Sequence, residues 1–373
     1  MKKIFNKNPF DYWIFAFSLM LISLGIVMVF SASTPYAKMH FNNIYYFLNK
    51  QLLAALIGFV VMIITSFIDY KLLKKAAIAL LVLGYISLIL VLIPGIGQIY
   101  NGAQRWINWG PGFQPSELFK ISLIIFLSFS IEKNYKKMNK FLKGIIYHLL
   151  YVAFAAVLLL KEPHLSATII IIAVAFIMLF IGGTKVYQLI SIGIIGGGAI
   201  TMFAIATDYT NDRLMIFLHP FSDPLDLGYQ LIQSFYAISA GGIFGRGLGK
   251  SIQKFLYMPE QHNDFIFSIL AEELGFIGCV VVIALFFLLV YRGIKVASRC
   301  KDVFGKMLAS GISVLFFIQA FLNIAVVTGS IPPTGISLPF FSYGGTNLVV
   351  SMFEIGILLS ISRFSNLKGG KKE

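Results

Sequence analysis

Long apolar runs constrain this chain more than any other feature of its sequence. A bilayer core about 30 Å thick is crossed by roughly 20 apolar residues in a helix. Hydrophobic residues make up 58% of the chain and charged residues 12%, about half the charge of a soluble domain. The sequence therefore predicts an all-α polytopic membrane protein, one domain over residues 1–373, and excludes a soluble enzyme. Ten spans are expected, at 12–30, 51–68, 76–93, 115–131, 144–160, 165–181, 189–206, 265–291, 307–328 and 347–361.

The positive charges indicate which side each connection occupies. Ten spans place both termini on one side of the membrane. Lys and Arg in the two tails and the even-numbered connections total 21, against 8 in the odd-numbered connections. The positive-inside rule places the larger group in the cytoplasm. The net charge of +14 is thus a topology signal, and we expect no nucleic-acid partner because no basic domain with interleaved aromatics is present.

The longest connections all lie on the predicted outer side. They cover residues 94–114, 208–263 and 329–346, and the largest joins the seventh and eighth spans. Long loops on one face of a rigid scaffold are where function usually concentrates. We therefore expect the active face to be extracytoplasmic.

Asp264 is the candidate that carries most of the chemistry. Glu260, His262 and Asp264 alternate along the chain, so an extended segment would direct all three the same way. A divalent cation is possible there, although neither a fourth ligand nor a supporting shell can be read from the sequence. Asp264 also opens the eighth span, where a carboxylate can simply cap the helix. Both interpretations stay open from the residues alone.

A polar stripe continues inward from Asp264. Glu272 lies two helical turns further along the same face, beside Glu273. Carboxylates within a span are costly and normally face a wet cavity or a partner. We expect the partner on the fourth span, where Glu117 and Lys120 share a face at i, i+3. A purely structural ion pair is the alternative for these four residues.

The third outer loop, residues 331–346, combines three prolines with glycines and includes Ser342. Prolines fix φ and glycines allow unusual backbone angles, so we expect a rigid irregular segment. At membrane depth such backbone survives only when buried in protein or lining an aqueous cavity. Cations gathered around it would suit an anionic lipid headgroup, above all a pyrophosphate. The candidates are Arg105, Arg213, Arg246, Lys250 and Lys254, each of which could instead be a solvated loop charge.

Several short motifs follow one another along the chain. They are RWI (105–107), QPSEL (114–118), EPHLS (162–166), GYQ (228–230), GRGLGKSIQK (245–254), PEQHNDF (259–265), AEELG (271–275), PPTG (332–335) and FSYGG (341–345). In this order they resemble the SEDS family of bacterial shape, elongation, division and sporulation proteins. TGSIPPTG at 328–335 and QSFY at 233–236 resemble the FtsW/SpoVE branch more than the RodA branch. Two departures are Asn263, where many members carry Thr, and His164, where the family usually has Asp.

This resemblance implies a peptidoglycan glycosyltransferase. Such an enzyme polymerises lipid II at the outer face of the bacterial cytoplasmic membrane and works with a class B penicillin-binding protein. It also assembles with other divisome or elongasome membrane proteins. The family aspartate of the Asp-Phe motif matches Asp264, which would act as general base for the acceptor sugar hydroxyl. Cations such as Lys120, Arg213 or Arg246 would stabilise the leaving pyrophosphate.

Two other classes of function fit the same residues. A lipid II flippase would use Glu117, Lys120, Glu272 and Glu273 as a polar path, whereas a division scaffold would need no chemistry. A flippase requires polar groups through the full depth of the bilayer, and here they gather at the outer end. The polymerase is therefore favoured, for septal rather than RodA-type synthesis. The substrate-binding candidates beside Asp264 are Glu117, Lys120, Arg105, Arg213, Arg246, Lys254, Glu260, His262, Glu272 and Ser342.

Overall fold

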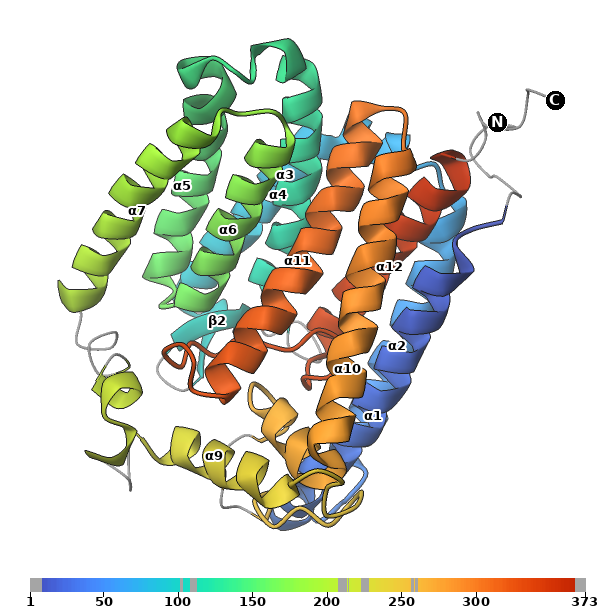
Figure 1. Ribbon diagram of the computed structural model, residues 1–373, viewed down its shortest axis with the longest axis vertical. Helices are drawn as coiled ribbons and strands as arrows, with labels where there is room; N and C mark the ends of the chain where they lie inside the picture. The colour runs from blue at the N-terminus through green and yellow to red at the C-terminus, as the bar shows by residue number, and fades with distance from the viewer. Residues whose placement is uncertain are drawn as a thin grey trace.

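The computed structural model describes residues 9–100, 103–107, 113–206, 213, 215–222, 228–255, 258 and 261–365 as a helical bundle (Figure 1). A two-stranded hairpin and a short helix lie at one end of the bundle. The helices are α1 (Tyr12–Phe41), α2 (Tyr46–Phe67), α3 (Lys71–Leu92), α4 (Pro115–Asn134), α5 (Tyr147–Lys161), α6 (Leu165–Ile181), α7 (Val186–Ala206), α9 (Tyr229–Gly241), α10 (Ile266–Arg299), α11 (Val303–Val327) and α12 (Gly345–Ser365). The strands are β1 (Gly97–Tyr100) and β2 (Ala103–Ile107).

Each predicted apolar run coincides with one of these helices. Within the described residues, seven helical segments are long and apolar enough to cross a membrane. They are α1, α2, α3, residues 141–161 containing α5, α10, α11 and α12. Helix α6 is also apolar but has only 17 residues. The fifth and sixth runs form two separate helices, α5 and α6, joined at residues 162–164, as their predicted bounds require. The count of ten spans stays a prediction.

The helix starts follow from local capping chemistry. Asp11 precedes α1 and accepts hydrogen bonds from the backbone of Trp13 at 3.1 Å and Ile14 at 3.3 Å. Asp302 does the same for α11, accepting from Gly305 at 2.9 Å. Both satisfy N–H groups that have no partner inside the first helical turn. Helix α4 begins with Pro115, whose missing N–H costs nothing at that position.

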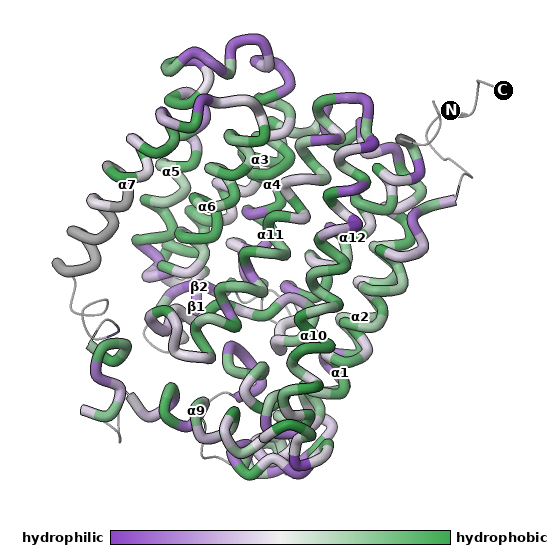
Figure 2. Tube along the Cα trace, in the orientation of Figure 1, coloured by the Kyte–Doolittle hydropathy of each residue, from purple (hydrophilic) through white to green (hydrophobic). Residues whose placement is uncertain are grey.

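The central helices of the bundle are α4, α11 and α12. In α11 and α12, 78% of the most apolar stretch is buried, against 28% in α2 and α3. The outer helices therefore expose apolar side chains around the bundle, which is the arrangement expected in lipid. Figure 2 shows that hydrophobic residues run along the helices and hydrophilic residues gather toward the two ends.

The two ends of the bundle differ. At one end, the Arg363 guanidinium of α12 lies 5.2 Å from the ring centroid of Phe10, which precedes α1, so the two ends of the described chain meet there. The opposite end carries α9 and the antiparallel hairpin of β1 and β2 (Figure 1). These two elements are not predicted by the apolar pattern. We call this second end the hairpin end.

Helix α10 is broken at Gly275, whose φ of +67° is left-handed. The backbone groups freed by the break pair with the loop that follows α9. Arg246 and Gly247 donate to the carbonyls of Glu272 and Glu273, both at 2.9 Å, and Phe276 donates to Gly242 at 2.9 Å. The break therefore leaves these backbone groups paired inside the protein.

Candidate active site

A cavity of about 830 Å³ opens at the hairpin end and collects residues from most of the bundle. Polar and aromatic side chains line it, together with backbone of the loop before α12. Six of the predicted site residues are among its lining residues: Arg105, Glu117, Lys120, Arg213, His262 and Asp264. These residues are far apart in sequence, so the fold brings them together.

Asp264 lies just outside the first turn of α10. That helix begins at Ile266 with Phe265 as its N-cap, one residue after Asp264. The Asp264 carboxylate lies against Gly335, where an added Cβ would come within 3.0 Å of Oδ2. Gly335 has a φ of +67°, so this contact needs a residue that tolerates the left-handed region and has no side chain.

Asn323 of α11 holds the Asp264 segment against the irregular loop. Its side chain is fully buried. Its Nδ2 donates to the carbonyl of Asp264 at 2.8 Å and to that of Ile336 at 2.5 Å. Tyr343 adds a backbone bond to the carbonyl of His262 at 2.9 Å. The backbone on both sides of the catalytic candidate is thus fixed to residues 331–344.

Glu117 and Lys120 form an ion pair on the first turns of α4, 2.8 Å apart and almost fully buried. Both line the cavity, as their i, i+3 spacing on one face predicts. Glu354 of α12 is also buried and interacts electrostatically with both residues. The pair therefore lies inside a wider charged cluster beneath the cavity, and removing one partner would strand a buried charge.

Two arginines reach the irregular backbone at the cavity rim. Arg213 donates to the carbonyl of Pro333 at 2.6 Å, and Arg105 of β2 donates to the carbonyl of Pro163. Ser166 donates to the carbonyl of Thr334, which lies in the same loop as Pro333. The loop is buried at alternate positions such as Ile336 and Leu338. It is therefore irregular backbone enclosed in protein, as its prolines and glycines predict.

The turn between α5 and α6 holds two buried titratable groups, Glu162 and His164, close to Arg105. Burial raises the pKa of Glu162 to about 8, and the charge of Arg105 opposes that rise. Burial also lowers the pKa of His164 well below its usual value, and the charges of Arg105 and Lys120 lower it further. Both groups are neutral at pH 7 for this reason. His164 lines the cavity.

His262 packs among aromatic rings. Its ring centroid lies 4.5 Å from that of Phe47, 5.5 Å from Tyr36 and 5.6 Å from Tyr343. Glu260, the third member of the proposed metal trio, lies outside the described residues. Among the residues that are described, no group of three His, Cys, Asp or Glu side chains could hold a metal ion. A divalent cation at this site stays a prediction.

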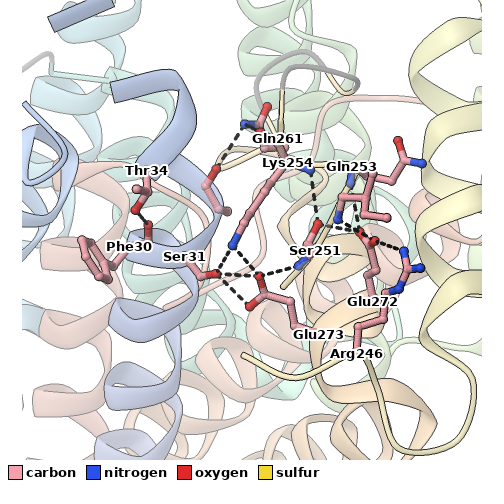
Figure 3. A network of polar contacts seen from close by, with 12 residues as sticks. Phe30, Ser31, Thr34, Arg246, Ser251, Gln253, Lys254, Gln261, Glu272 and Glu273 are labelled. Atoms are coloured by element: carbon pink, nitrogen blue, oxygen red, sulfur yellow. Dashed lines mark hydrogen bonds and ion pairs between the residues drawn. The ribbon is translucent and has the colours of Figure 1, made fainter. Parts of the chain in front are cut away.

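A second polar cluster lies outside the cavity lining (Figure 3). Glu273 accepts from Ser31 of α1 at 2.6 Å and pairs with Lys254 at 3.0 Å. Glu272 pairs with Arg246 at 3.3 Å and accepts the backbone N–H of Ile252 at 2.8 Å. The expected partnership of Glu272 and Glu273 with Glu117 and Lys120 is therefore wrong, and the structural ion-pair alternative describes both pairs.

The reason for this error is geometric. Helical spacing in the sequence predicts the direction in which a side chain leaves its own helix, but not which segment lies there. The break at Gly275 lets the loop that follows α9 pack against α10, and this loop supplies closer partners. Ser342 has a comparable structural contact, since its hydroxyl accepts the backbone N–H of Leu338 at 2.7 Å. The structure thus places Arg246, Lys254, Glu272 and Ser342 outside the cavity lining, next to the segments that form it.

Several lining residues are not predicted from the sequence. A buried amide within an apolar span is an available signal for Gln319 on α11, and for Asn323, which holds the Asp264 segment without lining the cavity. No comparable signal marks the others, because aromatic residues and loop cations are common outside sites. These additional lining residues include Lys50, Trp106, Gln230, Gln319 and Asn347.

Comparisons with known proteins agree along nearly the whole chain. The family model described as "Cell cycle protein", which covers FtsW, RodA and SpoVE, matches residues 12–367. A protein of Trichlorobacter lovleyi named "Probable peptidoglycan glycosyltransferase FtsW" is 44% identical over 97% of this chain and 95% of its own length. Stage V sporulation protein E of Bacillus subtilis is 39% identical over 96% of this chain and 99% of its own length.

Solved structures have the same fold. A chain from a study titled "Structural coordination of polymerization and crosslinking by a peptidoglycan synthase complex" superposes with a TM-score of 0.79 at 26% identity. The match covers 96% of this chain and 99% of that one. Rod shape determining protein RodA of Thermus thermophilus gives a TM-score of 0.69 at 25% identity, over 95% of this chain and 97% of that one.

Proposed function

Because the chain belongs to the FtsW/RodA/SpoVE family, the SEDS family, we propose that it is a peptidoglycan glycosyltransferase. It joins lipid II units into glycan strands at the outer face of the bacterial cytoplasmic membrane. The relatives named FtsW, at 38–44% identity, support a role in septal synthesis. Its proposed topology has ten spans with both termini in the cytoplasm.

The observation that carries the proposal is the single cavity that places Asp264 among Arg105, Arg213 and Lys120. A sugar hydroxyl is a weak nucleophile, and a positioned carboxylate that accepts its proton accelerates transfer by about 10²–10⁴-fold. The leaving group is a lipid pyrophosphate, whose growing negative charge needs fixed cations. One cavity therefore supplies a base for the acceptor and cations for the donor.

The sequence of events is one displacement. The acceptor hydroxyl loses its proton to Asp264 as its oxygen attacks the anomeric carbon of the donor sugar. The bond to the lipid pyrophosphate breaks, and the charge on its oxygen is stabilised by the arginines and Lys120. The family resemblance implies inversion at that carbon, which a single displacement produces without a covalent sugar on the protein. Asp264 is a base in this scheme and never a nucleophile.

Buried neighbours of the cavity keep these groups in place. Asn323 fixes the backbone of Asp264. The side chains of the Glu117–Lys120 pair are held in position because both are buried. Neutral His164 and protonated Glu162 add no charge near Arg105. Neither group therefore offsets the charge of Arg105, which can contact the substrate phosphates.

We further propose that a class B penicillin-binding protein is the partner. A chain with this fold comes from the study of a peptidoglycan synthase complex that coordinates polymerisation and crosslinking. Close packing of small residues between membrane helices supplies the contact expected for a single-span partner. Other divisome membrane proteins would join the same assembly.

The test is polymerisation of purified lipid II by the purified full chain, with and without its penicillin-binding partner. Glycan strands that appear with the chain and lengthen with the partner are the expected result. Transport of lipid II across a vesicle membrane without polymer would instead establish the flippase. If the chain binds its partner but produces no polymer and no transport, it acts as a scaffold.

A further inference from the structure

A smaller cavity of about 260 Å³ lies at the end of the bundle where the two ends of the described chain meet. It shares no lining residue with the cavity at the hairpin end. Its walls combine two arginines, one carboxylate and three aromatic rings, from Phe10, Tyr12 and Trp13 near the start of α1 and from α10. We call it the terminal cavity.

The single carboxylate of the terminal cavity is already engaged. Asp11 caps α1 through the backbone of Trp13 and Ile14, and it pairs with Arg292. The Nε of Arg292 is nevertheless buried and has no hydrogen-bond partner within the described part of the chain. A buried N–H without an acceptor carries a desolvation penalty, so the site has an unfilled place for an acceptor.

A second cation at the terminal cavity is uncompensated. Arg299 lies seven residues after Arg292, on the same side of α10, and forms no ion pair among the residues that the structure describes. It is exposed at the cavity. Two guanidinium groups against one carboxylate leave a net positive site, and guanidinium forks match phosphate geometry.

The surroundings of the cavity are those of a membrane interface. Tyr12 and Trp13 are 67% and 58% exposed, and such rings gather where hydrocarbon meets water. Beyond them, packed helices α1 and α10 expose Met20, Phe287 and Tyr291. An apolar surface long enough for acyl chains therefore begins at the cavity.

We propose that the terminal cavity binds the phosphate headgroup of an anionic phospholipid. Arg292 and Arg299 contact the phosphate, Trp13 lies at the glycerol level, and the acyl chains follow the exposed faces of α1 and α10. Basic pockets between membrane helices on the cytoplasmic side bind anionic headgroups in this way. The inference is separate from the transferase proposal, although the orientation proposed above places the lipid in the inner leaflet.

The experiment measures lipid binding to the purified full chain by native mass spectrometry. The probes are phosphatidylglycerol and phosphatidylcholine with matched acyl chains, and inorganic phosphate. We expect phosphatidylglycerol to bind more tightly than phosphatidylcholine, and Arg299→Gln to weaken it by about tenfold, the size of one charge-assisted hydrogen bond. Arg299→Lys should recover part of the loss.

Lys295→Gln is the matched control. Lys295 carries the same charge on the same helix but does not line the cavity, so its loss should leave phosphatidylglycerol binding nearly unchanged. Equal losses in Arg299→Gln and Lys295→Gln would mean general surface attraction and would overturn the site. Competition by inorganic phosphate as strong as that by the lipid would overturn the assignment to a lipid. Either failure leaves the polymerase assay unaffected.

Discussion

Asn323 is the side chain that connects the backbone at Asp264 to the loop of residues 331–344. Its amide donates to the carbonyls of Asp264 and Ile336 from the last turns of α11. Asn323→Leu gives a side chain of similar volume and removes both hydrogen bonds. We expect kcat to fall by about 10–100-fold, because a small misplacement of a catalytic group is costly, with a smaller change in KM.

Ser313→Ala is the control for that variant. Ser313 is buried in the same helix and donates to Ala309 within it, without touching the Asp264 segment. Its loss should leave kcat nearly unchanged. Equal effects of the two substitutions on lipid II turnover would mean that α11 acts only through its general stability.

Glu162 gives the stability of the protein a pH dependence of known sign. Its pKa is raised from 4.5 to about 8, so the folded state keeps a proton that the unfolded state has lost between those values. The contribution of Glu162 to stability therefore falls as pH rises from about 5 to about 8. The contribution of His164 has the opposite sign below its usual pKa, because burial lowers the pKa of His164. Glu162→Gln should remove the contribution of Glu162 from the pH dependence of thermal unfolding measured in detergent.

The surface carboxylate Glu132, paired with Lys74 at the opposite end, provides the comparison. Glu132→Gln should retain the wild-type slope between pH 5 and pH 8. A pH slope in Glu162→Gln that equals the wild-type slope would contradict the buried neutral carboxyl.

At the scale of single residues, sequence patterns predict chemistry better than partnership. The i, i+3 spacing of Glu117 and Lys120 predicts their pairing correctly because both lie on one helix. The pairing of Glu272 and Glu273 is predicted wrongly because their partners come from a loop. Contacts between distant segments depend on the packing of the whole bundle, which one sequence does not specify.

At the scale of elements, the break in α10 is the feature most open to test. A Cβ at Gly275 would lie 2.2 Å from the backbone N of Gly245, at a φ of +67°. Gly275→Ala must therefore move the loop or the helix. We expect a large drop in thermal stability, together with loss of activity through the displaced Asp264 segment.

Gly242→Ala separates strain from steric conflict. Gly242 also has a positive φ, +53°, but an added Cβ there meets no atom within 4 Å. It should cost only the backbone strain of about 1–3 kcal/mol. If Gly275→Ala unfolds at the same temperature as Gly242→Ala, the close approach of loop and helix at Gly275 does not contribute to stability.

The apolar runs predict the long helices well, since about 20 consecutive apolar residues leave few other conformations in lipid. They miss α9, the hairpin and the break at Gly275. Helix α9 is short and amphipathic, and the hairpin has only strands of four and five residues. Such elements depend on contacts with the bundle more than on their own pattern.

At the scale of the whole molecule, the orientation proposed from the charges can be checked by cysteine labelling. With Cys279 and Cys300 replaced, Lys137→Cys and Leu248→Cys introduce one thiol each. A membrane-impermeant maleimide applied to spheroplasts should label position 248 and spare position 137. The opposite pattern would invert the protein and place the cavity in the cytoplasm.

The central claim is that Asp264 is the general base of glycan polymerisation, and Asp264→Asn tests it most directly. Asparagine keeps the size of the side chain but cannot accept the proton at neutral pH. Lipid II polymerisation by the partner complex should fall by at least about 100-fold, while thermal stability and partner binding persist. Asp302→Asn, at a helix cap where asparagine substitutes well, should stay active. Near-normal polymerisation by a folded Asp264→Asn complex would contradict the account.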